Sequence, residues 1–271
     1  MNPNHYKKAL TIAGSDSGGG AGIQADLKSF SANGVYGMSA ITAITAQNTR
    51  GVQAIHPVPV NIIRQQIVSI MEDMGTDAVK TGMLHSSDVI NTIHMALEEY
   101  PAPYLVVDPV MVATSGDKLL EDEAIQTMIR VMLPMASLIT PNLPEAEIIL
   151  GRKIETPEQA IRAAKDLADT GARSILLKSG HAKGEELTDL LYLREENEMV
   201  QIPNPRIPTG NTHGTGCTLA SAIAAWLARG LTLRDATRKG LEYTHQAIER
   251  GSLYQLGHGN GPVHHFYKFW S

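Results

Sequence analysis

The chain is short of cysteine, of aromatic residues and of long apolar runs, and each shortage excludes a class of protein. One cysteine in 271 residues cannot form an intrachain disulfide, which excludes a disulfide-stabilised secreted fold and fits a reducing compartment. Residues 1–8 lack the apolar stretch of a secretory signal. No apolar run approaches the roughly 20 residues of a membrane-spanning helix. We therefore expect a cytoplasmic protein without a membrane partner.

Basic residues are outnumbered by acidic ones. The chain has 23 lysines and arginines against 28 acidic residues, a formal net charge of −5. This charge disfavours a nucleic acid or an anionic membrane as partner, whereas a nucleotide needs only a local positive pocket. The 43% of hydrophobic residues describes a soluble globular protein, and the 5% of aromatic residues predicts an aliphatic core.

Short apolar runs alternate with amphipathic segments along the chain. The apolar runs predict strands over Ala9–Ala13, Ser39–Thr45, Ala78–Thr81, Leu105–Val107, Leu138–Thr140 and Ser174–Lys178, and a hairpin formed by Leu187–Leu193 and Met199–Ile202. Helical spacing predicts helices over Ala21–Asn33, Val60–Met74, Asp88–Tyr100, Glu121–Leu133 and Leu219–Leu231, and two more that begin after Thr156 and Thr232. This alternation predicts an α/β fold, with a mostly parallel sheet covered by helices on both faces, in one domain over residues 1–271.

The segment Thr212–Cys217, which we call the anion turn, is glycine-rich and opens an apolar helix. Such a turn aims unpaired backbone N–H groups at one point, and the helix dipole adds positive potential there. This is a site for a phosphate or for the anion of a transition state. Cys217 stands at the same helix start, so we expect the pKa of its thiol to be lowered, although most free cysteines are buried small hydrophobes.

A second glycine-rich segment, Gly14–Gly22, follows the first predicted strand, and we call it the glycine loop. Its spacing fits neither the dinucleotide fingerprint nor the Walker A loop. A ligand-facing loop is the favoured interpretation because small residues let a backbone approach a substrate closely, and a flexible turn is the alternative. Asp26, early in the following helix, would as a lone carboxylate be a solvated residue or a cap partner.

Polar residues follow several predicted strands at the same sheet edge. Asp108 and, after the next strand, Asn142 and Glu145 suit Mg²⁺ held mostly through water and phosphate oxygens. Lys178, in the run that ends in Gly180 and His181, can neutralise transferring phosphates. Each alone would more often be a cap, a turn or a surface residue.

Gln47 follows an apolar strand and presents a donor and an acceptor side by side, which suits the edge of an aminopyrimidine. A lone glutamine is a weak signal. The ten histidines form no metal-binding pattern, and His213 is interpreted as a structural hydrogen-bonding residue.

Taken together, six segments resemble the hydroxymethylpyrimidine/phosphomethylpyrimidine kinases of thiamine biosynthesis. They are Ala9–Asp16, Gly18–Lys28, Lys80–Leu84, Val107–Met111, Thr140–Ala146 and Thr212–Thr218. The resemblance extends from about residue 8 to about residue 250. It implies the three-layer α/β/α fold of the ribokinase-like superfamily, a homodimer, ATP and Mg²⁺ as cofactors, and an aminopyrimidine alcohol and its monophosphate as substrates.

The resemblance also implies roles for individual residues. Cys217 takes the place of the catalytic base, and Gly214, Thr215 and Gly216 bind the transferring phosphoryl group. Substrate binding is assigned to Gly14, Gly20, Asp26, Gln47, Met83 and Val110, ATP binding to Asn142, Lys178, Gly180 and Thr212, and Mg²⁺ binding to Asp108 and Glu145. Since a thiolate is a weak base toward a hydroxyl, Cys217 could instead orient the alcohol.

Two other functions remain as alternatives. A pyridoxine/pyridoxal kinase would perform the same chemistry on another ring alcohol, but that ring offers Gln47 no matching edge. A non-catalytic nucleotide or vitamin binder would not need Cys217, Lys178 and the acidic residues together. The hairpin turn near Glu195–Asn197 and the segment His181–Glu186 are candidates for a mobile cover over the nucleotide.

Overall fold

The computed structural model describes residues 5–111, 120–179 and 186–270. Nine strands form one sheet in the order β3-β2-β1-β4-β5-β6-β7-β8-β9. The strands are β1 (Lys8–Asp16), β2 (Tyr36–Asn48), β3 (Gly51–Pro57), β4 (Ala78–Thr81), β5 (Leu105–Val107), β6 (Leu138–Ile139), β7 (Ser174–Leu177), β8 (Glu186–Leu193) and β9 (Glu198–Pro205). Strands β2, β1, β4, β5, β6 and β7 are parallel, while β3, β8 and β9 add antiparallel pairs at the two edges.

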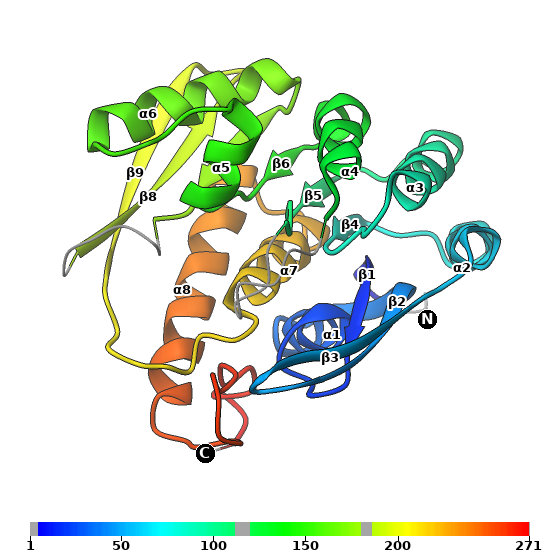
Figure 1. The fold of residues 1–271 in the computed structure, drawn as a ribbon, viewed down its shortest axis with the longest axis horizontal. Helices are drawn as coiled ribbons and strands as arrows, with labels where there is room; N and C mark the ends of the chain where they lie inside the picture. Colours follow the sequence, from blue (N-terminus) through cyan, green and yellow to red (C-terminus); the bar gives the residue numbers. More distant parts are fainter. Residues whose placement is uncertain (1–4, 112–119, 180–185, 271) are drawn as a thin grey trace.

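Helices cover both faces of this sheet (Figure 1). They are α1 (Gly22–Ala32), α2 (Val60–Asp73), α3 (Ser87–Glu99), α4 (Asp122–Thr127), α5 (Leu143–Leu150), α6 (Pro157–Asp166), α7 (Thr215–Ala228) and α8 (Leu233–Gly251). Figure 1 shows α1, α7 and α8 on one side of the sheet and the other helices on the opposite side. Within the described residues, no helix has both the length and the apolar character needed to cross a membrane.

The two faces of the sheet carry two separate apolar cores, because side chains alternate along a strand. In β1, Leu10 and Ile12 pack toward α2 and α3, whereas Ala9 packs toward α1 and α7. All three of these side chains are fully buried. The aliphatic, three-layer architecture expected from the sequence is therefore confirmed.

Three local features differ from the expectation. Strand β3 follows a two-residue turn and is mostly exposed, so its apolar residues show no buried alternation. Helix α5 is only eight residues long and begins with Pro144 at its second position. The helix expected over Glu121–Leu133 is α-helical only to Thr127 and continues as a π-turn and a 3₁₀-turn. Pro134 lies in that last turn and cannot donate an α-helical hydrogen bond.

Helix starts follow the local sequence closely. The Thr156 side chain accepts the N–H of Gln159 at 3.3 Å, and Pro157 occupies the first position of α6. Thr232 likewise caps α8 by accepting the N–H of Asp235. The hairpin expected near Leu187 is confirmed as β8 and β9.

Candidate active site

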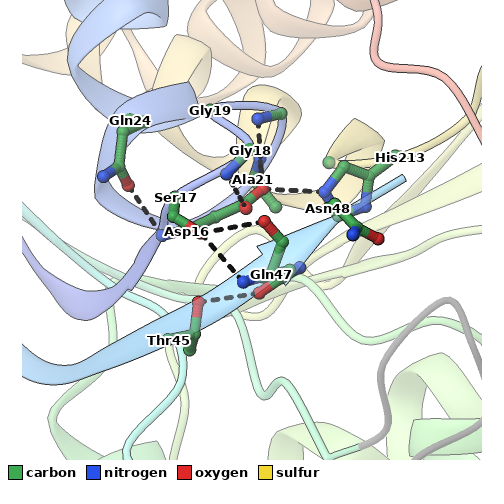
Figure 2. A network of polar contacts seen from close by, with 12 residues as sticks. Asp16, Ser17, Gly18, Gly19, Ala21, Gln24, Thr45, Gln47, Asn48 and His213 are labelled. Atoms are coloured by element: carbon green, nitrogen blue, oxygen red, sulfur yellow. Dashed lines mark hydrogen bonds and ion pairs between the residues drawn. The ribbon is translucent and has the colours of Figure 1, made fainter. Parts of the chain in front are cut away.

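Asp16, at the carboxyl end of β1, organises the glycine loop (Figure 2). Its carboxylate accepts backbone N–H groups from Gly18 at 2.8 Å, Gly20 at 3.1 Å and Ala21 at 2.8 Å. It also lies 2.8 Å from Nε2 of His213. Burial opposes the charged form, but the hydrogen bonds from His213 and the backbone hold the pKa of Asp16 below its usual value. One carboxylate thus fixes the shape of the loop and joins it to the anion turn.

The anion turn requires glycine at its centre. Gly214 is the N-cap of α7, with a left-handed φ of 77°. A Cβ atom there would lie 1.8 Å from the carbonyl oxygen of Gly20, a distance that no side chain can accept. The glycine loop and the anion turn are therefore in direct backbone contact. The first turn of α7 also has N–H groups without partners inside the helix, as an anion site needs.

Asp108 and Lys178 form an ion pair beside this turn. Nζ of Lys178 donates to Oδ1 of Asp108 at 3.0 Å, and the Thr140 hydroxyl donates to the same oxygen at 2.9 Å. Burial opposes ionisation of Asp108, but the ammonium groups of Lys178 and Lys80 hold the pKa of its carboxyl below the usual range. Gly216 lies next to this pair, since a Cβ there would be 3.4 Å from Nζ of Lys178.

Asn142 and Glu145 form a capping box at the start of α5. The Glu145 carboxylate accepts the Asn142 N–H at 2.8 Å, and the Asn142 side chain accepts the Glu145 N–H at 2.9 Å. Burial raises the pKa of Glu145 to about 7, Lys178 opposes this shift, and Asp108 adds to it. Two acidic groups are thus held close together in a buried position, an arrangement that a cation relieves.

The expectation of a lowered thiol pKa at Cys217 is wrong. Burial raises the pKa of Cys217 to about 11; Lys80 lowers it, while the carboxylates of Asp26 and Asp108 raise it further. Desolvation and the two carboxylates therefore outweigh the ammonium of Lys80, which favours the thiolate. The thiol is protonated at neutral pH, so Cys217 in this state is a hydrogen-bond donor rather than a strong base.

Asp26 does not lie on the wall of the site as expected. Its carboxylate is fully buried and bonded to Nζ of Lys80 at 2.9 Å through both oxygens. The hydroxyls of Thr11 and Ser221 each donate to it at 2.6 Å. A carboxylate engaged in this way joins α1 to β1, β4 and α7.

One cavity of about 980 Å³ opens at the carboxyl edge of the parallel strands. Of the residues assigned to the site, its lining contains Gly14, Gln47, Met83, Asp108, Val110, Asn142, Glu145, Lys178, Thr212, Gly214, Thr215, Gly216 and Cys217. Gly20 is not in that lining, because it packs beneath His213, where a Cβ would lie 2.4 Å from the ring. Gly180 and most of the segment His181–Glu186 lie outside the described residues.

Gln47 lies beside the glycine loop in the lining of this cavity. The Ser17 hydroxyl donates to the backbone carbonyl of Gln47 at 2.8 Å and accepts its N–H at the same distance (Figure 2). The Thr45 hydroxyl donates to the Ser15 carbonyl at 2.7 Å and lies 3.1 Å from the Gln47 side-chain amide. These bonds fix the position of the amide at the end of β2. Lys178 and Asn142 lie at the sheet edge formed by β6 and β7.

Comparison with known proteins decides the family. A family model described as phosphomethylpyrimidine kinase matches residues 16–264. A protein of Rhizobium meliloti (strain 1021), named hydroxymethylpyrimidine/phosphomethylpyrimidine kinase, is 50% identical over 97% of this chain and 98% of its own length. The chain belongs to the phosphomethylpyrimidine kinase family.

Solved structures agree with this family assignment. The crystal structure of phosphomethylpyrimidine kinase from Clostridium difficile 630 has a TM-score of 0.80 and 45% identity, and covers 89% of this chain and 99% of its own. An ADP complex of Bacillus subtilis pyridoxal kinase has a TM-score of 0.89 and 38% identity, and covers 96% of this chain and 98% of its own. As a member of the phosphomethylpyrimidine kinase family, the chain is a kinase with the ribokinase-like α/β/α fold.

Sequence reasoning missed the parts that Asp16 and Lys80 play in this kinase site, and it expected a structural hydrogen bond from His213 without naming the partner. Asp16 and His213 are 197 positions apart, and the partner of Lys80 is 54 positions away. The run of glycines after Asp16 was a usable signal, because several consecutive backbone N–H groups need an acceptor. Lys80 lies at the end of a buried strand, and no residue next to it in the sequence indicates its partner.

Proposed function

We propose that this kinase transfers the γ-phosphoryl group of ATP to the primary alcohol of 4-amino-5-hydroxymethyl-2-methylpyrimidine, and then phosphorylates the monophosphate to the diphosphate, in thiamine biosynthesis. The supporting observation is one cavity whose lining brings together Gln47, the anion turn and the Asp108–Lys178 pair. The family assignment, through relatives named for both phosphorylations, points the same way.

The chemistry requires positioning more than covalent participation. Gln47 pairs with the aminopyrimidine edge, and the thiol of Cys217 orients the alcohol toward the phosphorus. The oxygen–phosphorus bond forms as the bond to ADP breaks, and the hydroxyl proton passes late to an oxygen of the transferred phosphoryl group, so a protonated Cys217 is compatible with catalysis. Lys178 and the N–H groups at the start of α7 stabilise the charge on the transferring group.

Mg²⁺ fits the acidic residues of this cavity. Asp108 and Glu145 would hold the ion, partly through water, since Mg²⁺ binds one or two carboxylates together with substrate phosphates. The raised pKa of Glu145, caused by burial and by the nearby Asp108, marks a position where a cation relieves charge crowding. When bound, Mg²⁺ neutralises phosphate oxygens of ATP.

A pyridoxal kinase activity is the second candidate. It is favoured by the close fit of this chain to a solved structure named pyridoxal kinase. The same cavity and the same anion turn would serve that reaction, and only the ring contacts would differ. Gln47 supports the pyrimidine, because an amide matches the donor and acceptor atoms of an aminopyrimidine.

The test is ADP release from ATP and Mg²⁺ with hydroxymethylpyrimidine, its monophosphate or pyridoxal. We expect turnover of both pyrimidines, and a fall in kcat for Cys217→Ala. Gln47→Leu should raise KM for the pyrimidines roughly tenfold, from the loss of a paired polar contact, with less effect on pyridoxal. Turnover of pyridoxal alone would overturn the assignment, and ligand binding without ADP release would leave a binding protein.

We further propose that residues 1–271 act as one cytoplasmic domain that forms a homodimer. One sheet runs through the described residues, which supports a single domain. Ile44, on strand β2 next to the sheet edge, is 52% exposed, which suits a contact with a second copy. Light scattering coupled to size-exclusion chromatography tests this, and a mass near 29.3 kDa would contradict it.

A further inference from the structure

The anion turn is bonded to the segment Gly261–His265, which lies far along the chain. On the N-terminal side of Gly214, the His213 N–H donates to the carbonyl of Gly261 at 3.1 Å, and His213 forms a parallel bridge with Pro262. Earlier still, the Asn211 side chain donates to the carbonyl of Gly251 at 2.7 Å. The approach to the turn is therefore fixed by residues at and beyond the end of α8.

On the other side of the turn, Thr218 connects Gly214 to His265. The Thr218 hydroxyl is fully buried and donates to the carbonyl of Gly214 at 2.8 Å, and the Thr218 N–H donates to the same oxygen at 2.9 Å. Nε2 of His265 lies 3.0 Å from that hydroxyl. Because the hydroxyl has only one hydrogen, which goes to Gly214, Nε2 of His265 is the donor in the second bond.

His265 is itself held in place. It is 5% exposed, and the Tyr243 hydroxyl donates to its backbone carbonyl at 2.7 Å. Burial, followed by the charges of Lys28 and His264, lowers the pKa of His265 to about 3. The ring is therefore neutral at physiological pH and keeps both a donor and an acceptor nitrogen.

We propose that His265 is a positioning residue for phosphoryl transfer, acting through Thr218 to fix the Gly214 peptide plane from which α7 begins. This inference rests on the proposed kinase reaction. A peptide unit is rigid, so fixing the Gly214 carbonyl fixes the plane that leads into the first turn of α7. Gly214 needs this support, because glycine restricts its own backbone least.

Two matched pairs of variants test the relay. His265→Gln keeps a side-chain N–H donor and His265→Leu removes it; Thr218→Ser keeps the hydroxyl and Thr218→Val removes it. We expect the Leu and Val variants to lower kcat roughly ten- to hundredfold, since small misplacements of catalytic groups have effects of this size. The KM for ATP and for the alcohol should change less than about threefold, and the Gln and Ser variants should stay close to wild type.

Combining His265→Leu with Thr218→Val should be no worse than the more severe single change, because both break one relay. Thermal unfolding of every variant is measured in parallel. Equal kcat for His265→Gln and His265→Leu, or wild-type kcat in Thr218→Val, would overturn the inference. If His265→Leu does not fold, the Thr218 pair decides.

Failure of the proposed reaction has a separate signature. If wild type releases no ADP with any of the alcohols, the kinase proposal fails while the relay is still measurable. The readout is then the rise in Tm on adding ADP, Mg²⁺ and aluminium fluoride, a mimic of the transferring phosphoryl group. We expect a smaller rise in His265→Leu than in His265→Gln, and equal rises would overturn the relay.

Discussion

Cys217 shows how the surroundings of one residue can reverse an expectation drawn from its position in a helix. The helix start favours a thiolate, but burial and the carboxylates of Asp26 and Asp108 favour the thiol. The residues that raise this pKa are distant in sequence, so the position at the helix start alone predicted a pKa shift in the wrong direction. The location of Cys217 in the cavity agreed with the expectation, while its protonation state did not.

Alkylation measures this protonation state directly, because Cys217 is the chain's single cysteine. With a pKa of about 11, the reaction with iodoacetamide should be much slower at pH 7 than for free cysteine, and should rise roughly tenfold per pH unit up to about pH 10. Cys217→Ala is the blank for reaction at other side chains. A rate that levels off near pH 7 would contradict the raised pKa.

Glu145 links the site to the stability of the fold. The pKa of Glu145 is raised from 4.5 to about 7, so its protonated carboxyl stabilises the folded state. This contribution to the free energy of unfolding is complete below about pH 4.5 and is lost as pH rises through 7. Glu145→Gln keeps a neutral acceptor for the Asn142 N–H and removes this loss. We expect its gain in Tm to be larger at pH 8 than at pH 5, by about 3 °C or more.

Thermal unfolding at the two pH values, without Mg²⁺ or nucleotide, provides the measurement. Glu147→Gln is the matched control on the same helix, because hydrogen bonds from Lys153 and Ile154 lower rather than raise the pKa of Glu147. Because a lowered pKa leaves Glu147 ionised at both pH values, the effect of Glu147→Gln on Tm should be nearly the same at pH 5 and pH 8. An equal gain for Glu145→Gln at both pH values would contradict the raised pKa.

At the scale of an element, the start of α7 depends on a contact that only glycine allows. Gly214→Ala places a Cβ against the carbonyl of Gly20 in addition to the strain of a positive φ. Gly151 has a similar φ of 65° but nothing within 4 Å of its Cβ position. Gly151→Ala should therefore lower the free energy of unfolding by only about 1 kcal/mol.

Gly214→Ala should lower the free energy of unfolding by more than about 2 kcal/mol. It should also reduce kcat at least roughly a hundredfold, because the anion turn moves away from the glycine loop. Chemical denaturation and ADP release on the two variants make the comparison. Similar stability losses in both, with kcat retained in Gly214→Ala, would show that the backbone contact is not needed.

The elements differ in how far the sequence predicted them. Helices α6 and α8 have capping residues at Thr156 and Thr232, and both starts were predicted correctly. Strand β3 was missed because an exposed edge strand has no buried face to create an alternating pattern. The helix after Glu121 was predicted too regular, since apolar spacing does not distinguish α-helical from π or 3₁₀ turns.

At the scale of the whole molecule, the buried pair of Asp26 and Lys80 joins the layers beneath the site. Both side chains are fully buried, and α1, β1, β4 and α7 meet at this point. We expect Lys80→Met to lower the free energy of unfolding by about 3–5 kcal/mol, because it leaves a buried carboxylate without its cation.

Adding Asp26→Asn to Lys80→Met should recover part of this loss, so the double change costs less than the sum of the single ones. Arg64→Met breaks the surface pair with Glu99, whose side chains are 44% and 49% exposed, and should cost less than about 1 kcal/mol. Denaturant unfolding of the four variants tests this. Additive effects at Asp26 and Lys80 would contradict the coupling.

The same long-range contacts explain what the sequence could not predict. The sheet edge that collects Asp108, Asn142 and Lys178 follows from the alternation of strands and helices, and the prediction of their proximity was correct. The burial of Asp26 depends on Lys80 and Ser221, which are 54 and 195 positions away. A local sequence pattern does not predict partners that are so far apart in the chain.

The bridge between the glycine loop and the anion turn has a consequence for how the protein is made. Figure 1 shows the red end of the chain beside the turn between β2 and β3, where the N–H groups of His258 and Gly259 donate to the Thr49 hydroxyl. During translation, the glycine loop therefore leaves the ribosome long before the anion turn and the segment Gly261–His265 have been synthesised. Until residues 212–265 are translated, a nascent chain has the glycine loop but nothing to close it against, so catalytic competence arrives in one late step of synthesis.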